Sequence, residues 1–207
     1  MISSILLAAG QSKRMSGENK LIKSVKGIPL IKCALNNILK SHVNEIIIVL
    51  GYQNETIEKL IDKTSRIKFV FNSNFESGMA SSIKKGIKKL SKKTDSFFIT
   101  LGDMPSINYD TYNQLIKCNK NKKAIVPMFK GQQGNPVLFP KSFEEKLLSI
   151  QGDSGAKKIL EINKKEVLYL EINDPGIIKD LDVPSDFNNL SKIEILQTVP
   201  SVIIANL

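Results

Sequence analysis

The sequence is short of the side chains on which several kinds of site depend. It has no tryptophan, one histidine and two cysteines among its 207 residues. Cys33 and Cys118 each fall in a helical pattern and not in a Cys-x-x-Cys spacing, so a metal cluster or a disulfide framework is poorly supported and a reducing cytosol fits best. His42 lies between a predicted helix and a predicted strand, away from the edge where ligands are expected, so we predict a surface position for it.

Long apolar runs are also missing. The first ten residues, MISSILLAAG, lack a basic start and are far too short to span a bilayer, and no later run approaches the length of a membrane helix. We therefore expect neither an export signal nor a membrane partner, and we expect a cytoplasmic protein.

Arginine is scarce, since only Arg14 and Arg66 occur among 30 basic residues, and the net charge is +10. Such a charge permits binding to nucleic acid, an anionic membrane surface or small anionic substrates, and it does not choose among them. The lysine-rich run 84–93 places its lysines opposite an apolar helix stripe and contains no aromatic side chain for base stacking. We interpret most lysines as a solvated surface and expect no nucleic-acid partner.

What the sequence does contain is an alternation of strands and helices. Apolar, β-branched runs predict strands at 2–8, 45–51, 67–71, 96–101, 124–129, 135–139 and 166–172, and helical periodicity falls at 31–39, 57–61, 80–90, 110–118, 143–148 and 152–162. This order predicts an α/β fold that is Rossmann-like and doubly wound, with a mainly parallel sheet and helices on both faces. We expect one domain over residues 1–190. The apolar tail, 191–207, could dock as a helix, swap into a partner or pair along an edge.

Ligands of an open parallel sheet bind beyond the carboxyl ends of its strands, so the loops 9–20, 72–82 and 102–105 are the informative ones. The first is neither a dinucleotide motif nor a Walker A motif. Ala8, Ala9 and Gly10 nevertheless allow the backbone close to a ligand, and Arg14 offers a planar fork for two phosphate oxygens. The loop therefore has the parts of a phosphate cradle, although a tight turn with solvated basic residues has the same composition.

Carboxylates supply the second kind of candidate. Asp103 ends a buried strand, where an isolated carboxylate suits Mg²⁺ or, alternatively, a helix cap. Asp180 and Asp182 alternate on an extended segment, which would point both side chains the same way. Pro184 favours a helix start, and Asp186 in its first turn is better explained by the helix dipole.

In combination these segments resemble a known family. LAAGQSKRM, NKL, FNSNFESGMASSIKKGI, LGDMP, GNPVLF, GDSGAKKIL and DLDVPSDF, in this order over about residues 4–190, look like the molybdenum cofactor nucleotidyltransferases. Leu-Ala-Ala-Gly and Gly-Met-x-x-Ser resemble the cytidylyltransferase branch. One departure concerns the acceptor, because that branch carries Gly-His-Pro where this chain has Gly134-Asn135-Pro136.

The resemblance implies a role for each matching residue. Arg14, Lys20 and Asp103 would be catalytic. The nucleotide would contact Leu7, Ala8, Ala9, Gly10, Arg14, Lys20, Asn72, Gly78, Met79, Ser81 and Ser82. The metal ligands would be Asp103 and Asp182, with Asp180 as a further candidate. The acceptor would face Gln133, Gly134, Asn135, Pro136, Gly152, Asp153, Gly155 and Ala156.

The implied reaction joins CMP from CTP to the phosphate of molybdopterin, with Mg²⁺ as cofactor and pyrophosphate as the leaving group. A phosphate with a second pKa near ~6 is largely ionised at neutral pH and needs no general base, which agrees with the scarcity of histidine. Another NTP or another acceptor, such as a sugar phosphate, keeps the same chemistry. A molybdopterin- or nucleotide-binding chaperone is the non-catalytic alternative, and a transient contact with a molybdoenzyme or an insertion chaperone belongs to the same expectation.

Overall fold

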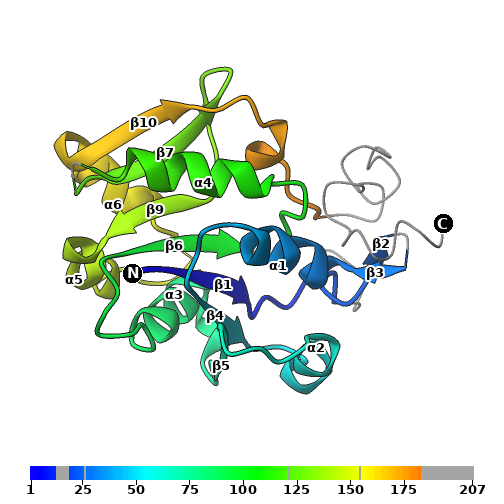
Figure 1. Ribbon diagram of the computed structural model, residues 1–207. Coiled ribbons are helices and arrows are strands. Elements are labelled where there is room, and N and C mark those ends of the chain that lie inside the picture. Colours follow the sequence, from blue (N-terminus) through cyan, green and yellow to red (C-terminus); the bar gives the residue numbers. More distant parts are fainter. Residues whose placement is uncertain (13–18, 26, 121, 154, 183–207) are drawn as a thin grey trace.

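The computed structural model describes residues 1–12, 19–25, 27–120, 122–153 and 155–182. Arg14, Pro184, Asp186 and the tail 191–207 lie outside the described residues. Seven strands form the main sheet in the order β10-β7-β9-β6-β1-β4-β5, with β8 pairing β7 beside it (Figure 1). The strands are β1 (Ile2–Ala8), β4 (Glu45–Leu50), β5 (Ile67–Phe71), β6 (Ser96–Leu101), β7 (Ala124–Phe129), β8 (Gln132–Gln133), β9 (Val137–Pro140) and β10 (Val167–Glu171).

The sheet is mainly parallel, as the sequence predicts. Strand β1 pairs in parallel with β4 and β6, and β5 and β10 also join their neighbours in parallel. Strand β9 is antiparallel to both β6 and β7. Two short strands, β2 (Ser24–Val25) and β3 (Ile28–Pro29), form a separate antiparallel pair that the sequence pattern did not indicate.

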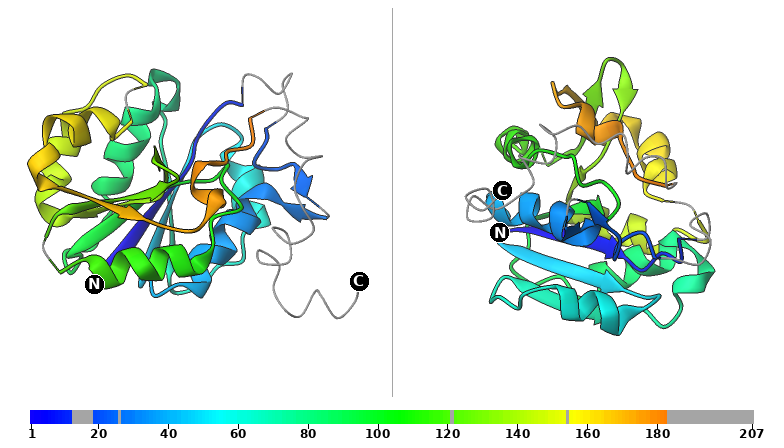
Figure 2. Two further views of the ribbon diagram at one scale, coloured as in Figure 1. Left: turned by 90° about the horizontal axis from the view of Figure 1, so that it is seen from above. Right: turned by 90° about the vertical axis from the view of Figure 1, so that its right-hand side faces the viewer.

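Helices cover both faces of the sheet, which confirms the doubly wound prediction (Figure 2). Helices α1 (Leu30–Lys40), α2 (Asn54–Leu60) and α4 (Tyr109–Cys118) pack in one apolar core, and α3 (Met79–Ile87), α5 (Glu144–Leu148) and α6 (Lys157–Ile162) pack in the other. All six residues of β4 are buried, because a central parallel strand covered on both sides has no polar face. Short 3-10 turns occur at η1 (Phe75–Ser77), η2 (Lys141–Phe143), η3 (Lys164–Glu166) and η4 (Pro175–Ile178).

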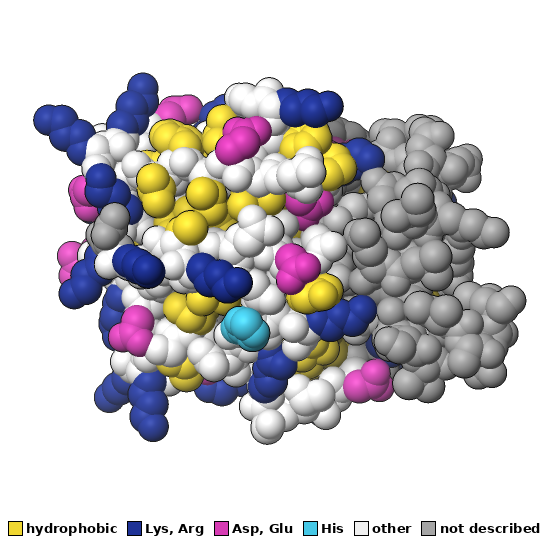
Figure 3. Space-filling view, turned by 45° about the horizontal axis from the view of Figure 1, so that its top comes forward, with side chains coloured by type: hydrophobic (Ala, Val, Ile, Leu, Met, Phe, Trp, Pro, Cys, Tyr) yellow, Lys and Arg dark blue, Asp and Glu magenta, His cyan; other side chains and the backbone are white. Residues whose placement is uncertain are grey.

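The surface carries the single histidine and many of the basic side chains (Figure 3). His42 is exposed, and Figure 3 shows lysine and arginine side chains spread over the molecular face rather than gathered in one patch. Among the described helices, none is long and apolar enough to cross a membrane.

Glu45, at the start of β4, has a buried carboxylate that is held by several hydrogen bonds. Its carboxylate accepts hydrogen bonds from Ser3 Oγ (2.9 Å), Lys68 Nζ (2.6 Å) and the Ser91 amide (3.3 Å). Burial alone would raise the pKa of Glu45, but these partners outweigh it and hold the pKa below the ordinary value of 4.5.

We expect Glu45→Gln to lower the free energy of unfolding at pH 7 by about 1–3 kcal/mol, because charged hydrogen bonds are lost. A depressed carboxyl pKa stabilises the fold above pH 4.5, and this contribution disappears as the pH falls through the folded-state pKa. Urea unfolding from pH 7 down to pH 3 should therefore show the variant and the wild type converging in acid. A gap that stays constant over this range would contradict the prediction.

Candidate active site

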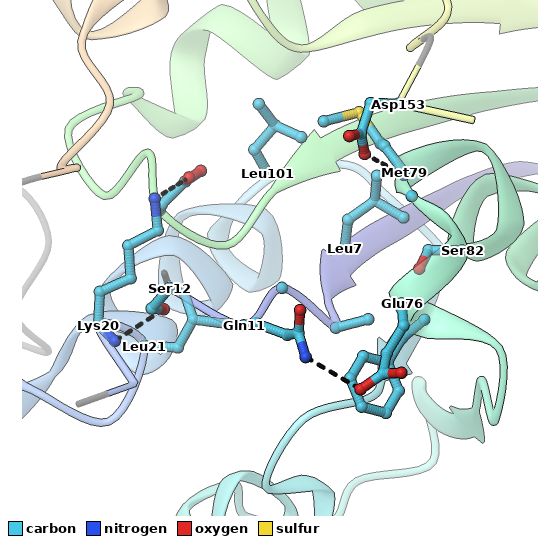
Figure 4. Close-up of a pocket in the computed structure, with 15 residues that line it drawn as sticks. Leu7, Gln11, Ser12, Lys20, Leu21, Glu76, Met79, Ser82, Leu101 and Asp153 are labelled. Carbon is cyan, nitrogen blue, oxygen red and sulfur yellow. Dashed lines mark hydrogen bonds and ion pairs between the residues drawn. The ribbon is translucent and has the colours of Figure 1, made fainter. Parts of the chain in front are cut away.

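A cavity of about 300 Å³ opens beyond the carboxyl ends of β1 and β6 (Figure 4). It is the place where the loops that follow the parallel strands come together, as expected for an open α/β sheet. Its lining consists of Leu7, Ala9, Gly10, Gln11, Ser12, Lys20, Leu21, Phe75, Glu76, Gly78, Met79, Ser82, Leu101, Asp103 and Asp153.

An ion-pair cluster occupies one side of this cavity. Lys20 Nζ lies 2.6 Å from Asp103 Oδ2 and 2.5 Å from Asp182 Oδ1, and the three side chains are only 14, 22 and 33% exposed. Burial on its own would lower the pKa of Lys20, but the two carboxylates outweigh it and raise the pKa above its usual value of 10.5. Lys20 therefore stays a cation at neutral pH, between two anions that are 79 residues apart in the sequence.

Asp103 has the features of a metal ligand. Its Oδ1 is buried and has no hydrogen-bond partner among the described residues, although its other oxygen binds Lys20. An anionic oxygen left without a partner in a cavity suits a hard cation. No group of three or more histidine, cysteine or acidic side chains with metal-site geometry occurs in the described part of the chain. Two carboxylates fit a cation such as Mg²⁺, which keeps several waters and takes further oxygens from substrate phosphates.

The segment before Asp182 is hydrogen-bonded to the loop that contains Asp103. The backbone amide of Leu181 donates to the carbonyl of Asp103 (3.0 Å), and the Leu181 side chain is buried. This anchor brings Asp182 to Lys20 and leaves Asp180 exposed. Of the two alternating carboxylates, the structure thus brings Asp182 to the cluster.

The loop after β1 is held on the cavity by its own polar groups. Ser12 Oγ accepts from the Lys20 amide (3.1 Å), and Asn19 Oδ1 accepts from the Leu21 amide (3.0 Å). These bonds set where Lys20 leaves the backbone. Arg14, predicted in the same loop, lies outside the described residues.

Three of the predicted nucleotide-binding residues that the structure describes, Ala8, Asn72 and Ser81, do not line the cavity. Ala8 is completely buried in the core. Asn72 uses both donors of its carboxamide on Ser81 Oγ (2.8 Å) and Ser82 Oγ (3.0 Å), and Ser81 Oγ in turn donates to the carbonyls of Asn74 and Gly78. Asn72 and Ser81 thus fix the shape of the 72–82 loop, while Ser82 lines the cavity itself.

At Gly78 the 72–82 loop packs against the loop at residues 152–153. Its φ is +103°, and a Cβ there would lie 2.5 Å from the Gly152 carbonyl carbon and 2.6 Å from Asp153 Oδ1. Asp153 Oδ1 accepts from the Met79 amide (3.3 Å) and Gly152 O accepts from the Ala80 amide (3.0 Å), so this loop caps the start of α3. Glycine is required at residue 78 by both the backbone conformation and the close approach.

A second cavity of about 280 Å³ adjoins the first, since Met79 and Leu101 line both. Five of the predicted acceptor residues lie around it: Gln133, Gly134, Asn135, Gly155 and Ala156. Pro136 follows Asn135 through a cis peptide bond and is not part of the lining. Asp153 instead lines the first cavity, and Gly152 packs against Gly78.

A family model described as the MobA-like NTP transferase domain matches residues 4–167. The chain belongs to this family. It is a nucleotidyltransferase, and the resemblance found from the sequence motifs is confirmed.

Individual relatives of this MobA-like protein are distant. The chain is 27% identical to the molybdenum cofactor cytidylyltransferase of Escherichia coli K12 over 186 residues, which cover 90% of this chain and 93% of the relative. The Mycobacterium tuberculosis protein Rv0371c superposes with a TM-score of 0.80 at 21% identity, covering 90 and 95% of the two chains. A manganese complex of Rv0371c superposes with a TM-score of 0.70 at 17% identity, covering 97 and 98%.

The same fold also occurs in a synthase. A 4-diphosphocytidyl-2C-methyl-D-erythritol synthase from Anaerococcus prevotii superposes with a TM-score of 0.73 at 17% identity, covering 90% of this chain and 92% of the other. At this identity the match shows the fold alone.

Besides Leu21 and Leu101, four residues of the cavity lining were given no individual role from the sequence motifs: Gln11, Ser12, Phe75 and Glu76. They lie in the loops singled out after β1 and β5, but in positions where the motifs gave no reason to choose one side chain over its neighbours. Their position in these loops, and not their residue type, is the feature of the sequence that indicates a place in the cavity lining.

Proposed function

We propose that this protein is a Mg²⁺-dependent cytidylyltransferase that joins CMP from CTP to the terminal phosphate of molybdopterin and releases pyrophosphate. The observation that carries the proposal is the cluster of Lys20, Asp103 and Asp182 at a cavity of about 300 Å³. A second cavity adjoins this one, and Met79 and Leu101 line both. The likeness to the Escherichia coli cytidylyltransferase supports the choice of nucleotide and acceptor.

The proposed step needs positioning and charge neutralisation rather than a base. An oxygen of the acceptor phosphate attacks the α-phosphorus of CTP, a new P–O bond forms, and the bond between the α-phosphorus and its bridging oxygen to the β-phosphate breaks. The electron pair leaves with pyrophosphate. The attacking phosphate is already largely ionised, so no proton has to be removed first.

The described residues divide this work between them. Lys20 would supply a cation for the phosphates, and Asp103 with Asp182 would hold Mg²⁺. When bound, the metal would neutralise charge on the phosphate oxygens and on the leaving pyrophosphate. Gly10 and Ala9 leave the backbone amides of the first loop accessible to phosphate, and Arg14 belongs to the proposal as a further phosphate ligand.

The second cavity supports an acceptor with a flat, partly apolar ring system. Its lining includes the apolar side chains of Ile83, Val137 and Leu160 and the polar ones of Gln133, Asn135 and Lys157. A different phosphorylated acceptor, such as a sugar phosphate, is the second candidate, because the polar side chains of this lining could bind its hydroxyl groups.

Pyrophosphate release tests this function directly. Purified protein is incubated with Mg²⁺, CTP and one acceptor at a time: molybdopterin, molybdopterin with molybdate, glucosamine 1-phosphate or methylerythritol phosphate. We expect pyrophosphate release with molybdopterin, with or without molybdate. We expect none with glucosamine 1-phosphate or methylerythritol phosphate. Release with a sugar phosphate instead would keep nucleotidyl transfer and replace the acceptor.

We also expect CTP to be preferred to GTP and ATP. The backbone turn at Gly78 and Met79 and the hydroxyl of Ser82 line one side of the first cavity. We expect the space beside them to accommodate a pyrimidine more easily than a purine. Each polar group that a larger base leaves unpaired costs roughly 1–3 kcal/mol, which corresponds to about tenfold to a hundredfold in selectivity. Competition among the three NTPs at equal concentration measures this ratio, and a purine preference would contradict the cytidylyl assignment.

The proposal also covers the limits of the catalytic domain and the cellular compartment of the protein. We propose that residues 1–190 form the catalytic domain and that residues 191–207 follow it as a C-terminal tail. Neither Cys33 nor Cys118 is in a disulfide, which supports a reducing cytoplasm. A transient contact with a molybdoenzyme or its insertion chaperone would follow from the cofactor product.

A further inference from the structure

A polar pair from two loops lies on the side of the first cavity away from Lys20 (Figure 4). Gln11, just after β1, donates from Nε2 to Oε1 of Glu76, which belongs to η1, over 3.2 Å. Both side chains line the cavity. Gln11 is half-buried and Glu76 is exposed, so the carboxylate is available to a ligand.

Charge decides which part of a nucleotide meets this pair. Lys20 is the one cationic side chain among the described residues of the cavity lining, and the two carboxylates beside it would hold Mg²⁺, so the triphosphate with its metal belongs on that side. The carboxylate of Glu76 repels phosphate and is compatible with a neutral group that carries hydrogen-bond donors. The base is the part of a nucleoside triphosphate furthest from the β- and γ-phosphates, and it therefore reaches the Glu76 side.

We propose that Glu76 and Gln11 read the hydrogen-bonding edge of cytosine and make the enzyme prefer CTP to UTP. This inference rests on the proposed nucleotidyl transfer. Glu76 is an acceptor and suits the exocyclic N4 amino group. Gln11 has given one N–H to Glu76 and has a second one for the N3 acceptor.

Uracil reverses both of these contacts. It presents the O4 carbonyl where cytosine has N4–H₂, and N3–H where cytosine has an acceptor. An oxygen would then face the Glu76 carboxylate, and two N–H groups would face each other at Gln11. Because the two pyrimidines have almost the same size, the comparison isolates this polar edge from the width of the cavity.

The test is a titration of CTP and UTP, each with Mg²⁺, into the wild-type protein and Glu76→Gln, followed by calorimetry. We expect the wild type to bind CTP roughly tenfold to a hundredfold more tightly than UTP. In Glu76→Gln this ratio should fall by about tenfold, because a carboxamide can turn its NH₂ group toward uracil O4. Gln11→Ala should lower the ratio as well, since Glu76 loses its orienting partner.

Glu145→Gln is the matched control, because Glu145 is exposed on α5 and does not line the cavity. It should keep the wild-type ratio. Equal binding of CTP and UTP by the wild type, or an unchanged ratio in Glu76→Gln, would overturn this inference and leave nucleotide binding intact. If the wild-type protein bound no nucleoside triphosphate, the proposed function would fail, and this inference with it.

Discussion

Asp103→Asn should leave the protein folded and lower its Mg²⁺-dependent turnover by about a hundredfold or more. The change replaces an anionic oxygen by a neutral amide of the same size, and the loss of several kcal/mol of charge stabilisation corresponds to at least this factor. The fold should persist, because the Asp103 carbonyl still accepts from the Leu181 amide and an asparagine oxygen can still accept from Lys20.

Two measurements separate a metal role from a structural one. Mn²⁺ binding, followed by electron paramagnetic resonance without substrate, should weaken in Asp103→Asn, while the urea unfolding midpoint stays near that of the wild type. Asp62→Asn is a suitable control, since Asp62 is 88% exposed and pairs with Lys32 on the surface. Normal turnover in a folded Asp103→Asn protein would remove Asp103 from the metal site.

The second carboxylate can be identified with the same assay. Asp182→Asn should weaken Mn²⁺ binding, because Asp182 shares Lys20 with Asp103. Asp180→Asn should have little effect, since Asp180 is exposed to solvent. The reverse order would show that the extended segment turns when metal binds.

Local pattern was sufficient to predict most of the fold. The apolar runs at β1, β4 and β6 are buried on both faces, and such runs indicate central parallel strands without any further information. Boundaries were less certain: α3 ends at Ile87 although its apolar stripe continues to Leu90. The hairpin of β2 and β3 has two residues in each strand, too few to produce a periodic signal.

The candidate site was predictable where chain position alone decides it. Asp103 and Lys20 follow strands that end at one edge of the sheet, so their proximity follows from topology. The role of Asp153 was not predictable in this way. Its carboxylate caps α3 from a loop 74 residues away, and it therefore lines the first cavity rather than the second. That placement depends on tertiary contacts at Gly78, which no local pattern records.

Lys20 binds one carboxylate oxygen of each of the two proposed metal ligands. Its ammonium group lies within 2.6 Å of carboxylate oxygens from both Asp103 and Asp182. A divalent cation bound to those oxygens must displace the ammonium or share them with it, and like charges at this distance repel. The same displacement would turn Lys20 toward the phosphates of the nucleotide, where its charge is needed.

Lys20→Met should therefore have two opposite effects. Turnover with Mg²⁺ and CTP should fall by roughly a hundredfold, because a cation that neutralises the transferring phosphates is lost. Mn²⁺ affinity in the absence of nucleotide should rise by several-fold, because the two carboxylates no longer have a competing cation. Methionine keeps most of the length of the lysine side chain, so the cavity wall stays filled.

Lys32→Met is the matched control for Lys20→Met, since Lys32 also pairs with an aspartate (3.1 Å to Asp62) but lies outside the cavity. It should change neither Mn²⁺ affinity nor turnover. If Lys20→Met lowered turnover and left Mn²⁺ affinity unchanged, Lys20 would act on phosphate alone and the metal would bind elsewhere. A rise in affinity confined to Lys20→Met would instead show that ammonium and metal compete for the same carboxylate oxygens, and that metal binding releases Lys20 for the substrate.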